Sequence, residues 1–432
     1  MSEHYDTIIV GSGISGAFLA QELTSHGQNV LLLEKGGYHR FLGNHIAVLR
    51  IADRKGFRYT KEHNLVASGV TVGGSSVISA GTFYRPPKDA FKEWGIFLEN
   101  ELNSVEKELK PTTISNELIG EGNLNLLNAG NRLGFNWSKL PKFINETKCI
   151  PGCSSCMLGC KRDAKYTARF LIESAKINGL ILQKKKADRV VLNKNSILGV
   201  KPQHGHTITA DKVIISAGGV HSSIILQKSG ISNAGKSFFM DPLIFTYSKV
   251  QYKELNTIHN IPMAVGTYKF YNEGFMQSPV VDPWGLFLIT MVLQKNPLNV
   301  FKFRHYPRLI GIMTKIQDEK NGTLGFGRFS LGISKKLTSQ DRSRLDKGEQ
   351  IASEVLLEAG GDPKTIFSSI IRGAHPGGSN AIGEVVDADF QTRIPNLFVC
   401  DSSILPYSLG TPLIAVLMAF SKRLGNFILN SA

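Results

Sequence analysis

Two short segments, about 360 residues apart, contain residues whose types and spacing could bind a cofactor and move a proton. Gly11, Gly13 and Gly16 have the G-x-G-x-x-G spacing of a loop that lets backbone N–H groups approach a diphosphate. His375 lies among glycines near the other end, and histidine changes its charge near neutral pH. The two segments together indicate a cofactor bound beside a proton acceptor.

The elements around the three glycines predict a βαβ unit. Residues 5–10 are apolar and partly β-branched, residues 14–25 have helical apolar spacing, and residues 29–33 form a second apolar run. Glu34 follows that run, where its carboxylate can accept hydrogen bonds from an adenosine ribose. The predicted cofactor contacts of this unit are Gly11, Gly13, Ser15, Gly16, Glu34 and Lys35. The unit alone predicts a dinucleotide and leaves FAD and NAD open.

A second glycine-rich stretch, residues 69–86, favours one of these two cofactors. Gly73 and Gly74 remove side chains where backbone must approach a ring or a diphosphate, and two serines follow with hydroxyl groups. The stretch resembles the flavin-contacting loop of the glucose–methanol–choline (GMC) oxidoreductase family, in which a Gly-Gly-Ser-Ser turn passes the flavin. We therefore expect FAD. The predicted contacts in this loop are Gly73, Gly74, Ser75, Ser76 and Ser79.

The resemblance continues along the whole chain. Residues 187–191, 212–219 and 375–429 are similar, in order and spacing, to the family's adenine strand, its returning strand and its closing module. The resemblance implies further cofactor contacts at Val190, Ala217, Gly218, Asp401, Ser402, Thr411 and Pro412. It also implies that His375 is the catalytic histidine, with Thr411 in the place of its usual partner. Thr411 and Pro412 would open the last helix, whose positive end would then face the flavin.

Two departures from the family pattern bear on the chemistry. The family usually has Asn or His where Thr411 falls and Asn where Ser79 falls, and Tyr407 and Ser408 are further candidates to replace the missing partner. We still expect oxidation of the CH–OH group of an alcohol, sugar or polyol, with His375 accepting the hydroxyl proton as hydride passes to flavin N5. The electrons would go to a non-nicotinamide acceptor such as oxygen, a quinone or a protein. Two different functions stay open: flavin-dependent desaturation or isomerisation of an apolar substrate, and flavin and iron–sulfur electron transfer without a substrate of its own.

Four of the five cysteines, Cys149, Cys153, Cys156 and Cys160, lie within twelve residues. Such density in a cytoplasmic chain argues against a disulfide scaffold and for metal or redox use. The spacing suits four thiolates on one iron–sulfur cluster, and zinc would accept the same ligands. Disulfides and free, packed thiols also remain open. The fifth cysteine, Cys400, lies in an apolar run and is predicted to be part of the core.

The chain is basic, with a formal net charge of +15 from 50 Lys and Arg against 35 Asp and Glu. A basic surface can attract nucleic acid or anionic lipid. The densest basic cluster, at residues 184–189, lacks the aromatic residues of a base-stacking surface, so we expect no nucleic-acid partner. A peripheral membrane contact is compatible with the charge. No apolar run reaches the roughly 20 residues that span a bilayer and no signal-peptide pattern precedes the first strand, so we expect a cytoplasmic location.

The predicted architecture is α/β, with a doubly wound, Rossmann-like FAD-binding domain and an antiparallel-sheet substrate domain. Residues 1–85, 150–240 and 371–432 are expected to form the discontinuous FAD-binding domain, and residues 86–149 and 241–370 the substrate or cap domain. Within the latter, alternating apolar residues at 286–293 and at 309–316 predict two strands. Residues 338–359 predict an amphipathic helix.

Overall fold

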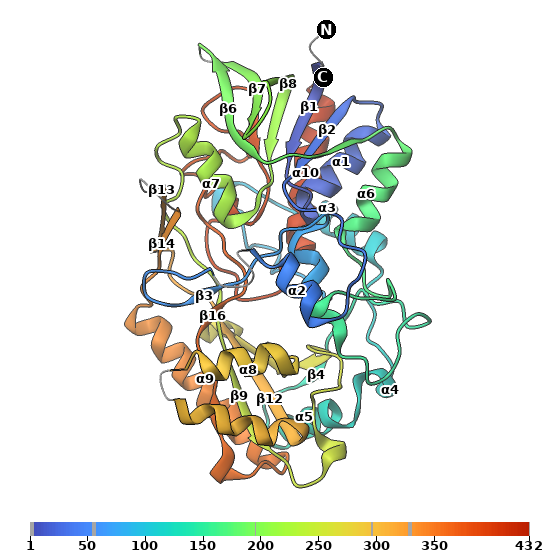
Figure 1. Cartoon of the computed structure of the whole chain (residues 1–432), viewed down its shortest axis with the longest axis vertical. Helices are drawn as coiled ribbons and strands as arrows, with labels where there is room; N and C mark the ends of the chain where they lie inside the picture. The colour runs from blue at the N-terminus through green and yellow to red at the C-terminus, as the bar shows by residue number, and fades with distance from the viewer. Residues whose placement is uncertain (1–3, 54–57, 195, 295–296, 327–330, 432) are drawn as a thin grey trace.

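A mostly parallel sheet forms one half of the computed structural model, which describes residues 4–53, 58–194, 196–294, 297–326 and 331–431 (Figure 1). β1 lies between β2 and β8, β5 extends the sheet beyond β2, and β17 pairs with β8; all these pairs are parallel. β7 and β6 continue the sheet in antiparallel pairing. The strands are β1 His4–Val10, β2 Val30–Glu34, β5 Ile181–Lys184, β6 Ala187–Asn193, β7 Ser196–Pro202, β8 Ile208–Ile215 and β17 Leu397–Val399.

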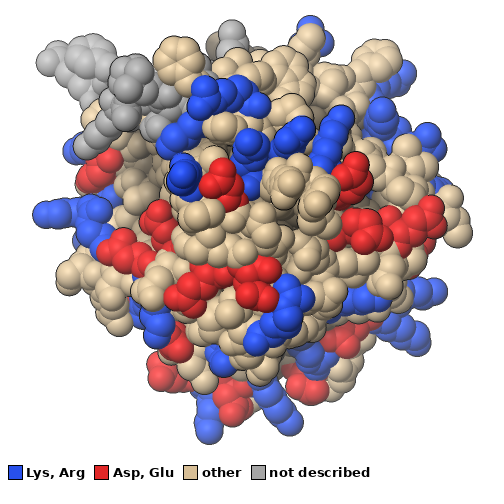
Figure 2. All heavy atoms as spheres, turned by 90° about the horizontal axis from the view of Figure 1, so that it is seen from below, with Lys and Arg blue, Asp and Glu red and all other residues tan. Residues whose placement is uncertain are grey.

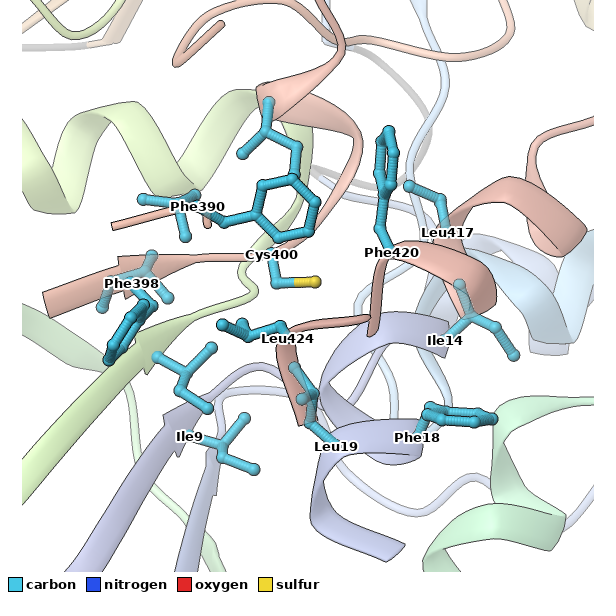
Figure 3. Packing of buried hydrophobic residues seen from close by; sticks show 14 of the residues in the cluster. Ile9, Ile14, Phe18, Leu19, Phe390, Phe398, Cys400, Leu417, Phe420 and Leu424 are labelled. Atoms are coloured by element: carbon cyan, nitrogen blue, oxygen red, sulfur yellow. The ribbon is translucent and has the colours of Figure 1, made fainter. Parts of the chain in front are cut away.

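Helices cover this sheet because its central strands are apolar on both faces. α1 packs against both α6 and α10, α10 also packs against α3, and α7 packs against β6. Figure 3 shows the core between sheet and helices, in which Cys400 lies among aromatic and aliphatic side chains, as predicted. The helices are α1 Ile14–Ser25, α3 Glu99–Leu109, α6 Ala168–Ile177, α7 Gly218–Lys228 and α10 Ile414–Asn430.

A second sheet lies in the other half of the molecule (Figure 1). Its strand order is β11–β12–β9–β16–β3, with β15 also beside β9, and every pair except β16–β3 is antiparallel. α9 packs against β9 and β12, and the Thr338 and Asp341 side chains form a capping box at its start. The strands are β3 Leu65–Val66, β9 Pro242–Lys249, β11 Phe275–Pro279, β12 Leu309–Ile316, β15 Phe367–Ser368 and β16 Arg372–Gly373.

The remaining elements are short ribbons, α-helices and 3₁₀ helices. Two ribbons pair antiparallel, β4 Ser138–Lys139 with β10 Val265–Gly266 and β13 Thr323–Phe326 with β14 Leu331–Ser334. The remaining α-helices are α2 His45–Ile51, α4 Asn116–Ile119, α5 Glu121–Arg132, α8 Trp284–Val292 and α9 Ser339–Glu358. The 3₁₀ helices are η2 Gly74–Ile78, η3 Lys92–Trp94, η4 Ser155–Leu158, η5 Lys253–Leu255, η6 Tyr271–Glu273, η7 Pro297–Arg308, η8 Pro363–Thr365 and η9 Ser402–Ile404.

The structure confirms the strand at 309–316 and the helix at 338–359, and it corrects two local predictions. Residues 286–293 are not a strand, because α8 covers residues 284–292 and buries Phe287, Thr290 and Met291 at helical spacing. A short run of apolar residues fits either element by pattern alone. The last helix begins at Ile414 rather than at Thr411, because the chain turns at Gly410 (φ +62°) and stays non-helical through Pro412.

The face of the molecule shown in Figure 2 carries charges of both signs. Seen from below, Lys and Arg side chains alternate with Asp and Glu over much of the surface, with Lys and Arg more frequent toward the upper part of the view (Figure 2). In the described ranges, no helix is long and apolar enough to cross a membrane.

Candidate functional site

The three N-terminal glycines form a turn in which two of them, Gly11 and Gly16, leave no room for a side chain. A Cβ on Gly11, whose φ is +105°, would lie 2.3 Å from the Ser216 carbonyl oxygen, and a Cβ on Gly16 would lie 2.0 Å from the Gly11 oxygen. A Cβ on Gly13 would meet no atom within 4 Å. The backbone therefore approaches itself closely at Gly11 and Gly16, and there is open space at Gly13 before the N-terminus of α1.

The second glycine loop lies directly on this turn. A Cβ on Gly74 would come within 2.9 Å of the Gly13 Cα, and the Gly73 N–H donates to the Ser12 hydroxyl at 3.2 Å. The Ser12 hydroxyl in turn donates to the Glu34 carboxylate at 2.7 Å. Glu34, which also accepts the Gly36 N–H at 2.6 Å, ties the turn to the end of β2.

The C-terminal segment meets the start of α7 beside the same turn. The Asp401 carboxylate accepts the Gly218 N–H at 2.8 Å and the Ser222 hydroxyl at 2.5 Å, and burial raises its pKa. The Ser402 hydroxyl donates to the Pro376 carbonyl at 2.7 Å, which places the loop after His375 against Ser402. Predicted residues from three distant parts of the chain therefore lie together.

His375 is held by an aspartate that the sequence analysis did not single out. Its Nδ1 lies 2.9 Å from an Asp241 carboxylate oxygen, and the Ser408 hydroxyl donates to the other oxygen at 2.5 Å. A carboxylate only accepts, so Nδ1 carries the proton and Nε2 is left as the basic nitrogen. Nε2 makes no hydrogen bond to any residue that the structure describes. Of the candidates to replace the missing partner, Ser408 is thus linked to His375.

Buried charges surround this pair. Asp318 accepts the backbone N–H of Asp241 at 3.0 Å and forms an ion pair with Lys335 at 3.0 Å, with both side chains fully buried. Burial raises the pKa of Asp318 to about 7. Burial also lowers the pKa of Lys315 to about 8, against the opposite effect of Asp241. Burial, followed by the nearby Lys315 charge, lowers the pKa of His375 below 6.5, although Asp241 opposes this shift.

Sequence signals for these missed residues exist. Lys315 is a charged residue near the end of an otherwise apolar predicted strand, a position where an unpaired charge is costly. Asp241 directly follows the apolar run 238–240, which the structure buries. Only the folded chain shows that its φ is +47°, in the left-handed region that non-glycine residues seldom adopt. Neither signal identifies His375 as the partner.

Two buried hydroxyls fit a polar ligand in this region. Thr411 is fully buried, and its hydroxyl has no hydrogen-bond partner among the described residues. The Ser15 hydroxyl, in the first turn of α1, is buried as well and makes no hydrogen bond to a described nitrogen or oxygen; the Cys400 thiol is its neighbour. Since buried polar groups are nearly always paired, both hydroxyls are suited to contact a bound cofactor.

The remaining predicted contacts lie around these two loops. Within the glycine loop, Ser75 accepts the Gly69 N–H, Ser76 donates to the Gly73 carbonyl, and Ser79 donates to the Ser76 carbonyl. Val190 and Lys35 contact opposite ends of α7. The Val190 N–H donates to the Ser229 hydroxyl at 2.8 Å, and Lys35 donates to His221 Nε2 at 2.7 Å. Pro412 is half-buried before α10.

A pocket of about 570 Å³ lies beside the His375 network. Trp94, Tyr271, Gln317 and Tyr407 are among its lining residues, and Gln317 donates to the Leu409 carbonyl, next to Ser408. The Trp94 and Tyr407 rings are stacked, with centroids 6.0 Å apart. Aromatic walls with a few amide and carboxylate groups are typical of small-molecule sites.

The four clustered cysteines line one small cavity, and all four are free thiols. Burial, followed by the neighbouring thiols, raises the pKa of Cys149 to about 11. Buried Lys165 donates to the carbonyls of Cys156, Val77 and Ser79, so it joins the cysteine loop to the glycine loop. Within the described ranges, no group of three or more His, Cys, Asp or Glu side chains is arranged as a metal site.

Comparison with known families agrees with this geometry. The sequence model of the N-terminal part of GMC oxidoreductases matches residues 5–243, and that of the C-terminal part matches residues 271–421. The chain belongs to the GMC oxidoreductase family. The resemblance inferred from the glycine loops and the closing module is therefore confirmed.

Relatives of this GMC oxidoreductase include proteins with and without a known activity. It is 30% identical to an uncharacterized protein of Methanocaldococcus jannaschii over 97% of this chain and 98% of the relative. It is 25% identical to a long-chain-alcohol oxidase of Arabidopsis thaliana over 95% of this chain, but it spans only 66% of that protein's length. Its fold matches formate oxidase from Aspergillus oryzae RIB40 with a TM-score of 0.76 and 14% identity, covering 100% of this chain and 99% of the other.

Proposed function

We propose that this GMC oxidoreductase binds FAD and oxidises the CH–OH group of an alcohol, sugar or polyol to the carbonyl. The observation that carries the proposal is the His375–Asp241 pair, which leaves the basic Nε2 free. The loop after His375 is joined through Ser402 to the segment whose Asp401 accepts the N–H of Gly218 at the start of α7. The alcohol oxidases among the relatives support the same reaction class. FAD, when bound, supplies the acceptor for the hydride of the carbinol carbon.

Each residue of the network has a distinct part in this proposal. His375 Nε2 accepts the hydroxyl proton of the substrate, because its lowered pKa keeps the imidazole neutral near pH 7. Asp241 fixes the ring orientation and the tautomer, and Ser408 holds the second carboxylate oxygen. Ser15, the α1 N-terminus and Thr411 would contact the cofactor, and the pocket beside Tyr271 and Tyr407 would admit the alcohol.

Anaerobic reduction of the purified protein tests the proposal. The protein should carry the absorbance of oxidised flavin, and that absorbance should bleach when the right alcohol from a panel of sugars, polyols and aliphatic alcohols is added. Bound flavin that no alcohol reduces, but that exchanges electrons with a partner protein, would contradict it in favour of an electron-transfer role. A product with a new C=C bond would instead identify a desaturase or isomerase.

We expect the rate of flavin reduction to depend on the protonation of His375. The pKa of His375 is lowered from 6.5, so the imidazole is neutral and active at neutral pH. The rate should therefore be constant near neutrality and fall about tenfold per pH unit below the lowered pKa. Stopped-flow reduction across this range measures the midpoint.

The Asp241→Asn variant is the matched test of this pH dependence. Because the Asp241 carboxylate raises the pKa of His375, its removal should move the midpoint to lower pH. A wild-type midpoint above 6.5 would contradict the assignment of His375 as a partly buried, neutral base.

We further propose that the four cysteines would hold an iron–sulfur cluster, which would supply one-electron transfer from the flavin toward a non-nicotinamide acceptor. The grouped thiols support this. A thiolate at Cys156 would in turn favour the charged forms of the buried Lys142 and Lys165, against the effect of burial. Burial, foremost among the causes, lowers the pKa of Lys142 to about 7 and that of Lys165 to about 8. A cytoplasmic location, which we also propose, would keep the thiols reduced.

Metal analysis of anaerobically purified protein tests the cluster. We expect iron and acid-labile sulfide in the wild type and the loss of both in Cys156→Ser. Cys400→Ser is the control and should keep them, because Cys400 lies in the hydrophobic core. Zinc without sulfide, or a wild type free of metal, would contradict the proposal.

A further inference from the structure

An apolar and basic surface lies on one side of the molecule, next to the glycine-rich stretch 69–86, whose Val70 N–H donates to the Ile51 carbonyl at the end of α2. It is formed by α2 with the residues leading into it, by α8 and by η7. Figure 1 shows α2 just above α8 on the side that faces the viewer, and the His45 and Trp284 rings join the two helices with centroids 4.8 Å apart. We call this surface the α2–α8 face.

Large apolar side chains on this face are exposed to solvent. Six of them are at least 42% exposed: Phe41, Ile46, Trp284, Val292, Leu293 and Phe301. α8 consists of Trp, Gly, Leu, Phe, Ile, Thr, Met and Val, with no charged residue, so its outer side is as apolar as its inner side. A helix that is apolar all round is expected in a core or in contact with lipid. Such a patch on a soluble surface marks an interaction site.

The inner side of α8 fixes the helix to the protein. Phe287 and Met291 are fully buried, and the Phe287 ring contacts the Tyr247 and Tyr306 rings at centroid distances of 5.4 and 5.3 Å. The exposed side is therefore held in place by the packing of the opposite side. At about 1.5 Å per residue, nine residues extend for about 14 Å, less than half of the about 30 Å of a bilayer core.

The exposed charges within the segments that form this face are basic. Residues 36–52 contain Arg40 and Arg50, and residues 283–294 and 297–308 contain Lys302, Arg304 and Arg308, whereas none of these stretches contains Asp or Glu. Arg40, Arg50, Arg304 and Arg308 are exposed. Basic residues around exposed Trp, Phe and Leu are the pattern of helices that lie in the interface of an anionic membrane.

We propose that the α2–α8 face docks on the surface of an anionic lipid bilayer, with α8 lying in the plane of the headgroups. The exposed apolar residues enter the boundary between headgroups and acyl chains, and the arginines contact lipid phosphates. This docking does not depend on the proposed oxidation or on the cysteine cluster. An anionic bilayer is also a partner that the basic net charge of the chain would attract.

Vesicle binding by the full, cofactor-loaded protein tests the docking. The wild type should co-sediment with phosphatidylcholine vesicles that contain about one third phosphatidylglycerol and should leave them as salt rises. The triple variant Ile46→Glu, Trp284→Glu, Val292→Glu should lower the bound-to-free ratio by at least about tenfold. The matched control Phe97→Glu, Ile177→Glu, Leu357→Glu replaces three exposed apolar residues elsewhere and should bind like the wild type.

A spectroscopic measurement checks the orientation. Trp284 is 53% exposed, so its fluorescence should shift to shorter wavelength on anionic vesicles, and Trp284→Phe should lose that shift while still binding. The proposal would be overturned if both triple variants lost vesicle binding equally, or if the triple variant of the α2–α8 face bound like the wild type. It would also be overturned if the wild type bound equally well to neutral vesicles. A wild type that dimerises in solution and becomes monomeric in the α2–α8 variant would overturn it in favour of a contact between two copies.

Discussion

Replacing His375 with alanine is expected to slow the reduction of bound FAD by alcohol by about 10²–10⁴-fold, the usual contribution of a positioned general base. The variant loses the only imidazole nitrogen of the network that is free to accept the substrate proton within the described structure. FAD should remain bound, because the glycine turn and the Gly73–Gly74 loop do not contain His375. Single-turnover anaerobic reduction, with the flavin absorbance as the signal, measures the change.

The control for this variant is His4→Ala. His4 is exposed and pairs with Asp211 and Thr209 at the start of β1, so its loss should leave the reduction rate unchanged. If His375→Ala reduces its flavin as fast as the wild type, the assignment of His375 as the base is wrong. If His375→Ala loses FAD but the remaining bound flavin is reduced at the wild-type rate, His375 has a structural role in cofactor binding instead.

Removing the charge of Asp282 is expected to destabilise the protein by about 3–5 kcal/mol. Arg372 donates two hydrogen bonds to Asp282, at 2.9 and 2.5 Å, and the Tyr247 hydroxyl donates a third at 3.1 Å. Both charged side chains are buried, so Asp282→Asn would leave the Arg372 guanidinium without a counter-charge. Arg372 lies three residues before His375, so the pair also fixes the strand that leads to the base.

Unfolding midpoints in urea, measured for the wild type and for Asp282→Asn, check this prediction. Asp188→Asn is the matched control, because Asp188 pairs with Arg189 and Lys228 on the surface and its loss should cost less than about 1 kcal/mol. Equal shifts in the two variants would contradict the view that burial of the Arg372–Asp282 pair decides its effect.

The parts of the fold that depend on neighbouring residues could be predicted from the sequence. The turn at Gly11 and Gly16 follows from glycine spacing, and the helix after it matches the predicted bounds 14–25. The capping box of α9 and the apolar pattern of β12 are local signals of the same kind. The turn, the helix and the capping box are defined by hydrogen bonds between residues close in sequence, and β12 is a mostly apolar run that is buried at every residue.

The predictions that were wrong concern segments whose structure is decided by tertiary contacts rather than by their own residues. The apolar run at 286–293 has no local feature that excludes a strand, and only the packing of Phe287 and Met291 under α8 selects the helix. Thr411 resembles a helix cap by type, but its hydroxyl makes no bond to the α10 backbone. Short apolar runs and single capping residues leave two structures close in energy, so tertiary contacts choose between them.

Short-range sequence patterns were enough to predict the glycine turn of a dinucleotide-type site, the membership of the GMC oxidoreductases and the position of a histidine in a glycine-rich loop near the end. The contacts of His375 could be seen only in the folded chain. Asp241 lies 134 residues before it in the chain, and Ser408 donates to that carboxylate from beyond it. These contacts depend on the antiparallel pairing of β16 with β9 and on the C-terminal segment that brings Ser408 to Asp241. Local propensity does not encode either of them. The exposure of α8 has the same origin, since burial is a property of the folded whole.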